Sequence, residues 1–360
     1  MRKIALYGVR AQVGVPLREY TTLRLGGPAR RFVTAEDTDA LVGAVRWCDA
    51  DGAPMLLLGG GSNLVISDEG VEGTVVRVAT RGYRLDAGGV LSVAAGEDWD
   101  EVVARTVADG YGGLECLSGI PGLVGATPVQ NVGAYGVEIA DLLRGVDLLD
   151  RRDGRVRAVS RSGLGLGYRT STLKNTDIAV VLRVRLALRT DGLSMPVRYA
   201  ELARMLGVEL GSRLPPAEVR AAVLELRRVK GMVLDPLDHD TWSAGSFFTN
   251  PVLADDDLPA MLRRITATVG DGLPVPQYPA GTGVTKLSAA WLIERAGFHR
   301  GHLGPGGRVA LSTKHTLALT NRGSASTADL LALAGEVAAG VRAAFGVELH
   351  PEPVLVGCSL

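Results

Sequence analysis

The feature that most constrains this chain is the stretch GIPGLVGATPVQNVGAYG (119–136), eighteen residues without a charged side chain. The whole chain has 47 glycines in 360 residues, about twice the usual share. A surface loop normally carries charges, and a packed helix avoids so much glycine and proline. Such a backbone suits close approach by a flat, neutral, hydrogen-bonding ring. A set of tight turns is the simpler alternative.

A second glycine-rich segment follows a run of leucines. LLLGGGSNLV places Gly59, Gly60 and Gly61 directly before Ser62 and Asn63. Successive N–H groups in a glycine turn form a concave site for anions, and serine and asparagine add donors. The segment is neither a P-loop nor a GxGxxG fingerprint. On its own it indicates either a phosphate-binding turn or an ordinary turn at the end of a strand.

Composition excludes several classes of protein. Lys+Arg and Asp+Glu both number 39, so no net charge draws the chain to nucleic acid or to a membrane surface. Three cysteines at no metal-like spacing predict reduced thiols and no metal site. No apolar run reaches the roughly 18 residues of a membrane-spanning helix, and Arg10 cuts short the apolar stretch after Arg2 and Lys3. We expect a cytoplasmic protein without membrane insertion.

Hydrophobic periodicity predicts two units of mixed α and β structure. In the first half, strands are expected at 30–35, 54–58, 74–79, 91–96 and 177–188. One helix is expected to start after a cap at Asp37 or Thr38, and another to cover 98–108. In the second half, helices are expected at 216–230, 257–268, 286–297 and from a cap at Thr327 to about Phe345, with a strand or hairpin at 308–321. The segment 191–216 is expected to be a loose boundary region.

The two glycine segments, together with TTLRLGG at 21–27, resemble the MurB-type UDP-N-acetylenolpyruvoylglucosamine reductases of peptidoglycan precursor synthesis. The resemblance extends over nearly the whole chain and points to the longer-loop class, in which a tyrosine covers the substrate. It implies an α+β fold. A two-part FAD-binding domain of the vanillyl-alcohol-oxidase/PCMH type (1–192) would precede a smaller α+β substrate-binding domain (193–360). The last strand, at about 348–360, would return to the FAD-binding part.

This resemblance also implies a reaction. NADPH would reduce noncovalent FAD and then leave, and UDP-N-acetylglucosamine enolpyruvate would take its place in the same pocket of a monomer, to be reduced to UDP-N-acetylmuramate. The first histidine is His239, so the N-terminal half cannot attach a flavin through histidine. FAD contacts are implied for Gly59, Gly60, Gly61, Ser62, Asn63, Gly119, Ile120, Pro121, Gly122, Gly125, Ala126, Gln130, Asn131, Gly133, Ala134, Tyr135 and Gly136.

The stretch GSFFTNP holds a serine between a glycine and two of the chain's five phenylalanines. Alone, this pattern is typical of a tight turn whose rings enter a core. Hydride addition to an enolpyruvyl ether builds negative charge on the neighbouring carbon and its carboxylate, so the reaction needs charge stabilisation and a proton delivered without bulk water. By resemblance, Ser246 is the proton donor, and Phe247 and Phe248 exclude water around it.

Two charged residues complete the implied catalytic group. Arg169 in LGYRTSTLK matches the family's arginine, and a guanidinium can hold a carboxylate through paired hydrogen bonds. A solvated surface arginine is the alternative. Glu352 in ELHPEPVLVG matches the glutamate that polarises the enolate or assists its protonation, although Pro353 replaces the valine usual there. Without the resemblance, Glu352 indicates the start of an edge strand.

Three further residues match family positions that hold the substrate. Tyr199 in VRYAEL matches the mobile-loop tyrosine over the UDP diphosphate, Lys230 in RRVKG matches the lysine that pairs with it, and Asn250 in FFTNP matches its asparagine partner. A lysine point charge and a tyrosine hydroxyl suit a diphosphate. Lys230 could equally compensate the dipole at the end of the preceding helix.

Two other functions stay open. An oxidase of alcohols or lactones from the same FAD-binding superfamily would explain the first half of the chain, but it would leave four residues without a role: Arg169, Ser246, Lys230 and Glu352. A non-catalytic flavin- or nucleotide-binding protein would be favoured by the loss of a catalytic position, and none is lost. Fold alone does not decide among these functions.

Overall fold

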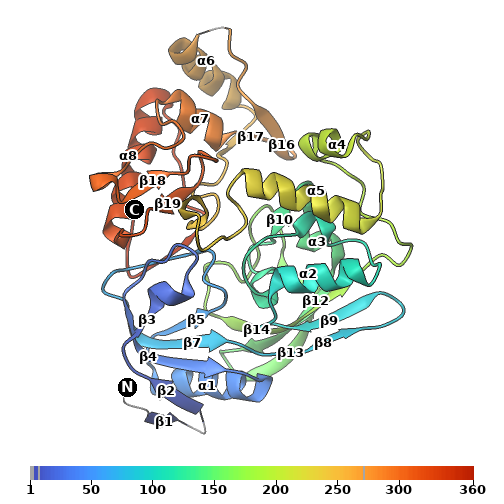
Figure 1. Ribbon diagram of the computed structural model, residues 1–360. Coiled ribbons are helices and arrows are strands. Elements are labelled where there is room, and N and C mark those ends of the chain that lie inside the picture. Colours follow the sequence, from blue (N-terminus) through green and yellow to red (C-terminus); the bar gives the residue numbers. More distant parts are fainter. Residues whose placement is uncertain (1–3, 7–8, 271) are drawn as a thin grey trace. The chain divides into compact units, whose positions relative to one another are not determined.

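The computed structural model describes residues 4–6, 9–270 and 272–360 (Figure 1). The expectation drawn from Arg2 and Lys3 lies outside these residues. The chain divides into two compact units: the first contains Ala29–Gly61 and Val71–Val233 with the N-terminal segment up to Val15, and the second contains Pro16–Pro28, Ser62–Gly70 and Leu234–Leu360. The expected boundary at 192/193 falls within the first unit. That residues 1–192 bind FAD and residues 193–360 bind the substrate stays a prediction.

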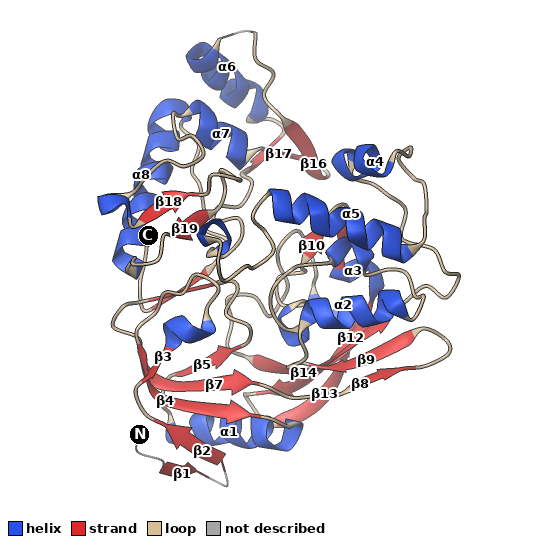
Figure 2. Cartoon of the chain, in the orientation of Figure 1, coloured by secondary structure: helices blue, strands red, loops and turns tan. Residues whose placement is uncertain are grey.

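The first unit begins with a sheet covered by one helix (Figure 2). Its strands lie in the order β1 (Ile4–Leu6), β2 (Val9–Gln12), β4 (Pro28–Ala35), β7 (Val71–Val78) and β5 (Met55–Leu58), and β4, β7 and β5 are parallel. Helix α1 (Thr38–Asp51) starts at Asp37, whose side chain accepts a hydrogen bond from Ala40 N at 2.8 Å. Asp37 is one of the two capping residues that the sequence offered, and Thr38 is the first residue of the helix.

A second sheet of the first unit is antiparallel. Its order is β13 (Arg155–Ser160), β12 (Leu143–Asp150), β14 (Ala179–Ala187), β9 (Val90–Ala94) and β8 (Tyr83–Leu85). Helices α2 (Trp99–Ala108), α3 (Ile139–Leu142) and α5 (Pro216–Val229) lie over it (Figure 1). Trp99 is almost fully buried in this core, and its indole nitrogen donates to Leu117 O at 2.9 Å. The expected strands at 91–96 and 177–188 and helices at 98–108 and 216–230 are confirmed.

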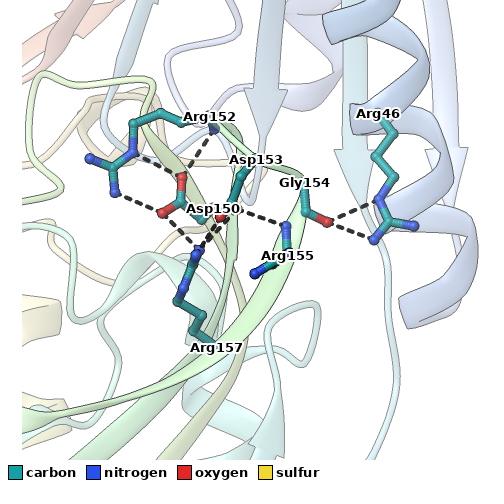
Figure 3. Close-up of polar contacts among 7 residues, drawn as sticks. All are labelled: Arg46, Asp150, Arg152, Asp153, Gly154, Arg155 and Arg157. Atoms are coloured by element: carbon teal, nitrogen blue, oxygen red, sulfur yellow. Dashed lines mark hydrogen bonds and ion pairs between the residues drawn. The ribbon is translucent and has the colours of Figure 1, made fainter.

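Arginine side chains donate hydrogen bonds to the turn between β12 and β13 (Figure 3). Asp150, at the end of β12, accepts hydrogen bonds from Arg152 Nε at 3.0 Å and Nη2 at 2.7 Å, and from Arg157 Nη1 at 2.9 Å. The hydrogen bonds from Arg152 hold the pKa of Asp150 at about 2. Arg46 of α1 donates from Nη2 to Gly154 O at 2.6 Å. These bonds tie the turn of the second sheet to the helix of the first.

The expected loose boundary at 191–216 is wrong in part, because this segment contains helix α4 (Ala200–Leu206). Leu202 and Ala203 of α4 are buried in the core of the first unit. The buried carboxylate of Glu115 accepts a hydrogen bond from Met195 N at 2.6 Å, which fixes the entry to the segment. Tertiary packing, rather than a clear apolar period, orders this part of the chain.

The second unit is built around one long helix, α8 (Thr327–Phe345). Its other elements are β6 (Leu64–Ile66), β15 (Val252–Ala254), α6 (Leu258–Val269), β16 (Gln277–Gly281), β17 (Val284–Leu287), α7 (Ala289–Arg295), β18 (Val309–Leu311), β19 (Leu319–Asn321) and β20 (Val354–Val356). The short strand β3 (Val15–Pro16) pairs with β4 of the first sheet. Strand β20 pairs in parallel with β6, and β18 with β19 forms the hairpin expected at 308–321. Among the described residues, no helix is long and apolar enough to cross a bilayer.

Two boundaries expected for the second unit are wrong. Helix α8 is capped by Ser326, which shares a reciprocal capping box with Asp329, whereas Thr327 donates its hydroxyl to Ile66 O at 2.6 Å. Helix α7 begins at Ala289 after a cap at Ser288, because the residues before it belong to β17. In both cases pairing with another segment decides which residue takes the terminal position.

Candidate active site

The two glycine-rich segments meet in the first unit. A Cβ atom on Gly60 would lie 2.7 Å from the Cα atom of Gly122, so neither backbone leaves room there for a side chain. The 119–136 segment is also pinned to the turn between β9 and α2, since Gly125 N donates to Ala95 O at 2.9 Å. Glycine is therefore required at Gly60 by direct backbone contact.

The contact between these segments leaves backbone donors unused. Within the described residues, the N–H groups of Gly60, Gly61 and Gly122 donate to no protein acceptor. Gly61 has a positive φ of 61°, which turns its N–H away from the direction of a strand. A group of open N–H donors on glycine suits the oxygens of a diphosphate. The residues present thus fit the phosphate part of FAD.

Asn131 supports the far end of the 119–136 segment. Its buried amide nitrogen donates to Glu138 Oε2 at 2.8 Å and to Gly167 O at 2.9 Å, and its oxygen accepts from Ala140 N at 3.0 Å. This side chain therefore acts as a scaffold for the loop. Its expected contact with FAD, like those of the other residues named for the cofactor, stays a prediction.

Arg169 lies against the same segment. Its Nη2 atom donates to Gly133 O at 2.6 Å, and its Nη1 atom is 4.0 Å from Glu138 Oε1. The side chain is only 23% exposed, so it is not a solvated surface arginine. Arg169 has a positive φ of 52°, an uncommon conformation that marks a tightly constrained residue. The guanidinium is thus placed beside the loop expected to hold the flavin.

Tyr199 and Lys230, the two residues of the first unit that are expected to bind the substrate diphosphate, each contact another side chain of that unit. Tyr199 packs edge-on against Tyr135, with 5.4 Å between ring centroids. Burial raises the pKa of the Tyr135 hydroxyl to about 12, so it remains a neutral hydrogen-bonding group. Lys230, at the end of α5, places its Nζ atom 2.5 Å from Glu201 Oε2. Sequence analysis did not single out Glu201, because the pair spans 29 residues and no local pattern joins its members.

In the second unit, Ser246 and Glu352 lie on hydrogen-bonded segments. Glu352 N donates to Phe247 O at 2.8 Å, so the residue after the serine is bound directly to the glutamate. Phe247 and Phe248 are each 1% exposed, with 5.1 Å between their ring centroids. The rings do enter the core, as the simpler alternative expected. The serine is held at the edge of that core, and within the described residues its hydroxyl makes no hydrogen bond.

Side chains from distant segments position this group. Thr22 donates its hydroxyl to Ser243 O at 2.6 Å, which fixes the start of the serine loop. Asn63 O accepts from Val354 N at 2.9 Å, and the Asn63 amide reaches Glu352 O at 3.4 Å. The positioning role of Thr22 could not be foreseen from TTLRLGG, because its partner Ser243 lies far along the chain.

Asn250, the third residue expected to hold the substrate, lies at the base of α7. Its side-chain oxygen accepts a hydrogen bond from Ala289 N at 3.0 Å, at the first residue of that helix. The bond uses the acceptor of the amide and leaves its nitrogen as the group that can donate to a ligand.

Comparison with known proteins agrees with both units. Residues 29–160 match the FAD binding domain family, and residues 235–356 match the C-terminal domain of UDP-N-acetylenolpyruvoylglucosamine reductase. The chain is 68% identical over 351 residues to the UDP-N-acetylenolpyruvoylglucosamine reductase of Saccharopolyspora erythraea, covering 96% of each chain. It is 55% identical over 357 residues to that of Mycolicibacterium smegmatis, covering 98% of this chain and 97% of the relative.

A solved structure agrees over the whole length. The crystal structure of UDP-N-acetylenolpyruvylglucosamine reductase (MurB) from Thermus caldophilus matches with a TM-score of 0.64 at 28% identity, covering 97% of this chain and 99% of that one. The expected fold, a FAD-binding domain with a family-specific C-terminal domain, is confirmed. The chain belongs to the UDP-N-acetylenolpyruvoylglucosamine reductase family.

Proposed function

We propose that this protein uses NADPH and FAD to reduce UDP-N-acetylglucosamine enolpyruvate to UDP-N-acetylmuramate, a step of peptidoglycan precursor synthesis. The observation that carries the proposal is the pairing of the Ser246 and Glu352 segments through Phe247, in a chain of this family. A protein that only binds flavin needs no serine on a segment hydrogen-bonded to that of a glutamate at the edge of a buried core.

FAD is held without a covalent bond by the two glycine segments. The open N–H groups of Gly60, Gly61 and Gly122 bind the diphosphate, together with Ser62 and Asn63. The uncharged 119–136 segment would hold the flavin and its ribityl arm. When bound, FAD supplies the hydride, which it takes from NADPH, to the methylene carbon of the enolpyruvyl ether.

Three side chains manage the charge that this addition creates. Arg169 binds the substrate carboxylate through its guanidinium, because two parallel donors match two carboxylate oxygens. Ser246 gives its hydroxyl proton to the carbon beside that carboxylate. Glu352 polarises the enolate and assists the proton transfer. Serine is a weak acid, so the buried rings of Phe247 and Phe248 matter by holding its hydroxyl at one place and excluding water.

The diphosphate of the sugar nucleotide is bound by Tyr199, Lys230 and Asn250. Lys230 supplies the positive charge and Tyr199 a hydroxyl donor. Asn250 contributes its amide nitrogen, since its oxygen is engaged with the backbone of α7. NADPH, which also carries a diphosphate, uses the same residues before the substrate enters. This role for Tyr199 supports the longer-loop class of the family for this chain.

We also propose that the protein acts as a monomer in the cytoplasm. Its nucleotide substrates occur there. We expect sedimentation of the FAD-loaded protein at micromolar concentration to give the mass of one chain. The mass of two chains would contradict the proposed monomer.

The test follows the flavin absorption band without oxygen. We expect NADPH to bleach the band of the purified protein and UDP-N-acetylglucosamine enolpyruvate to restore it. Bleaching with no recovery until oxygen is admitted would favour the oxidase. A flavin band that NADPH leaves unchanged would favour the non-catalytic binding protein.

A further inference from the structure

Lys230 is already paired with a carboxylate. Its ammonium nitrogen lies 2.5 Å from Glu201 Oε2, and the two side chains are 29% and 38% exposed. Glu201 stands in the first turn of α4, two residues after Tyr199. The bond therefore joins the end of α5 to the start of the helix whose preceding residue is the tyrosine assigned to the diphosphate.

A second cation, Arg227, stands near this pair on α5. Arg227 lies one helical turn before Lys230, and its Nη2 atom donates to Met232 O at 2.8 Å. Its Nε atom is buried and has no hydrogen-bond partner among the described residues. The Glu201 carboxylate is close enough to Tyr135 to add to the rise that burial causes in the pKa of that hydroxyl. Arg227 and Glu201 thus both act on the Tyr135 hydroxyl, with opposite effects on its pKa.

We infer that Glu201 is a resident counter-ion for Lys230, which the diphosphate of the incoming nucleotide displaces. The inference rests on the proposed function, in which Lys230 binds that diphosphate. A diphosphate offers more negative charge and more acceptor oxygens than one carboxylate, so it can win this exchange. A neutral ligand cannot. Glu201 is thereby a specificity-determining residue with no part in the chemical step.

The exchange needs no movement of the helix. Leu202 and Ala203, which follow Glu201, are 0% and 5% exposed and anchor α4 in the core. The Glu201 side chain itself is partly exposed and can rotate into water. The carboxylate thus competes for Lys230 from a fixed backbone, and its effect on affinity equals the strength of one partly exposed ion pair.

The test measures UDP binding to the FAD-loaded full chain by isothermal titration calorimetry. The Glu201→Gln variant removes the competing charge, so UDP should bind about two- to fivefold more tightly than to the parent protein. The Michaelis constant for the sugar nucleotide should fall by a similar factor while kcat does not rise. Glu225→Gln is the matched control, because it removes a carboxylate that pairs with Arg228 at 3.3 Å on α5. It should leave the affinity for UDP unchanged.

A second background separates competition from general repulsion. In Lys230→Ala, the further change Glu201→Gln should have no effect on UDP binding, because no lysine is left to release. Equal tightening in both backgrounds would overturn the inference, and so would weaker binding of UDP to Glu201→Gln, which would mean that Glu201 orients the lysine. If the parent protein does not bind UDP, the assigned role of Lys230 fails and the inference falls with it. Tight binding that Glu201→Gln leaves unchanged overturns the inference alone.

Discussion

The two units build their parts of the proposed site by opposite means. In the first unit the key positions lack side chains: Gly60 touches Gly122 directly, and the open donors are backbone N–H groups. In the second unit large side chains anchor the chain, because the rings of Phe247 and Phe248, which directly follow Ser246, are buried in a core. Binding a cofactor calls for a bare backbone, whereas delivering a proton calls for a rigid hydroxyl.

The largest expected effect concerns the second unit. Ser246→Ala should lower turnover about a hundred- to ten-thousand-fold, the range for losing a positioned proton donor. Steady-state oxidation of NADPH in the presence of the enolpyruvyl substrate measures it. Ser243→Ala is the control within the same loop, since it loses only the hydrogen bond at 3.2 Å from Gly245 N. Equal losses in the two variants would show that the loop, rather than the hydroxyl of Ser246, matters.

The first unit should respond to an added methyl group. Gly60→Ala forces the two glycine segments apart at a cost of about 1–3 kcal/mol. The affinity for FAD should therefore fall about five- to 150-fold, measured by fluorescence titration of the protein freed of its flavin.

A second glycine gives the matched comparison. Gly43, inside α1, has no atom within 4 Å of an added Cβ, so Gly43→Ala should stabilise the protein by about 0.5–1 kcal/mol and leave FAD binding alone. If Gly60→Ala binds FAD as well as Gly43→Ala does, the bare-backbone account of the first unit is wrong.

A smaller effect is expected from the residue that fixes the serine loop. Thr22→Val keeps the shape of the side chain but leaves Ser243 O without the hydroxyl that donates to it at 2.6 Å. The free energy of unfolding should fall by about 1–3 kcal/mol, because a buried carbonyl loses its partner. Urea unfolding measures the change. A drop in kcat with an unchanged affinity for FAD would place the effect in the second unit.

The smallest effect expected is a pH dependence in the first unit. Arg152 holds the pKa of Asp150 at about 2, below the value of about 3.9 in an unfolded chain. The pair therefore stabilises the fold above about pH 4, and this contribution is lost as the pH falls through the folded-state pKa. Arg152→Gln should lower the melting temperature at pH 7 more than at pH 3. Arg155→Gln, which leaves the bonds to Asp150 intact, should show no such difference between the two pH values.

Local signals account for the parts of the fold that could be predicted. The cap at Asp37 and the hairpin over 308–321 depend on neighbouring residues, and both are found. Strands β12 and β13 were not foreseen, because β13 is an exposed edge strand with a polar face and β12 ends in Asp150, a carboxylate kept in place by arginines. Ser326, rather than the expected Thr327, caps α8, because the Thr327 hydroxyl donates to Ile66 O of β6.

The candidate site divides in the same way. Ser246, Arg169 and Glu352 could be named because their motifs are contiguous in the sequence, although their roles stay predictions. Thr22 and Glu201 could not, because each acts on a residue far along the chain. Pairwise contacts of that kind leave no pattern in a single sequence.

The most direct test of the division between the units is to time the two half-reactions separately by stopped-flow absorption without oxygen. In Ser246→Ala, NADPH should bleach the flavin at the rate of the parent protein, and recovery on adding the enolpyruvyl substrate should be slowed about a hundred- to ten-thousand-fold. Such a split would show that the serine loop serves proton delivery and not the cofactor. Equal slowing of both half-reactions would contradict the account, because Ser246 would then support flavin binding or reduction as well.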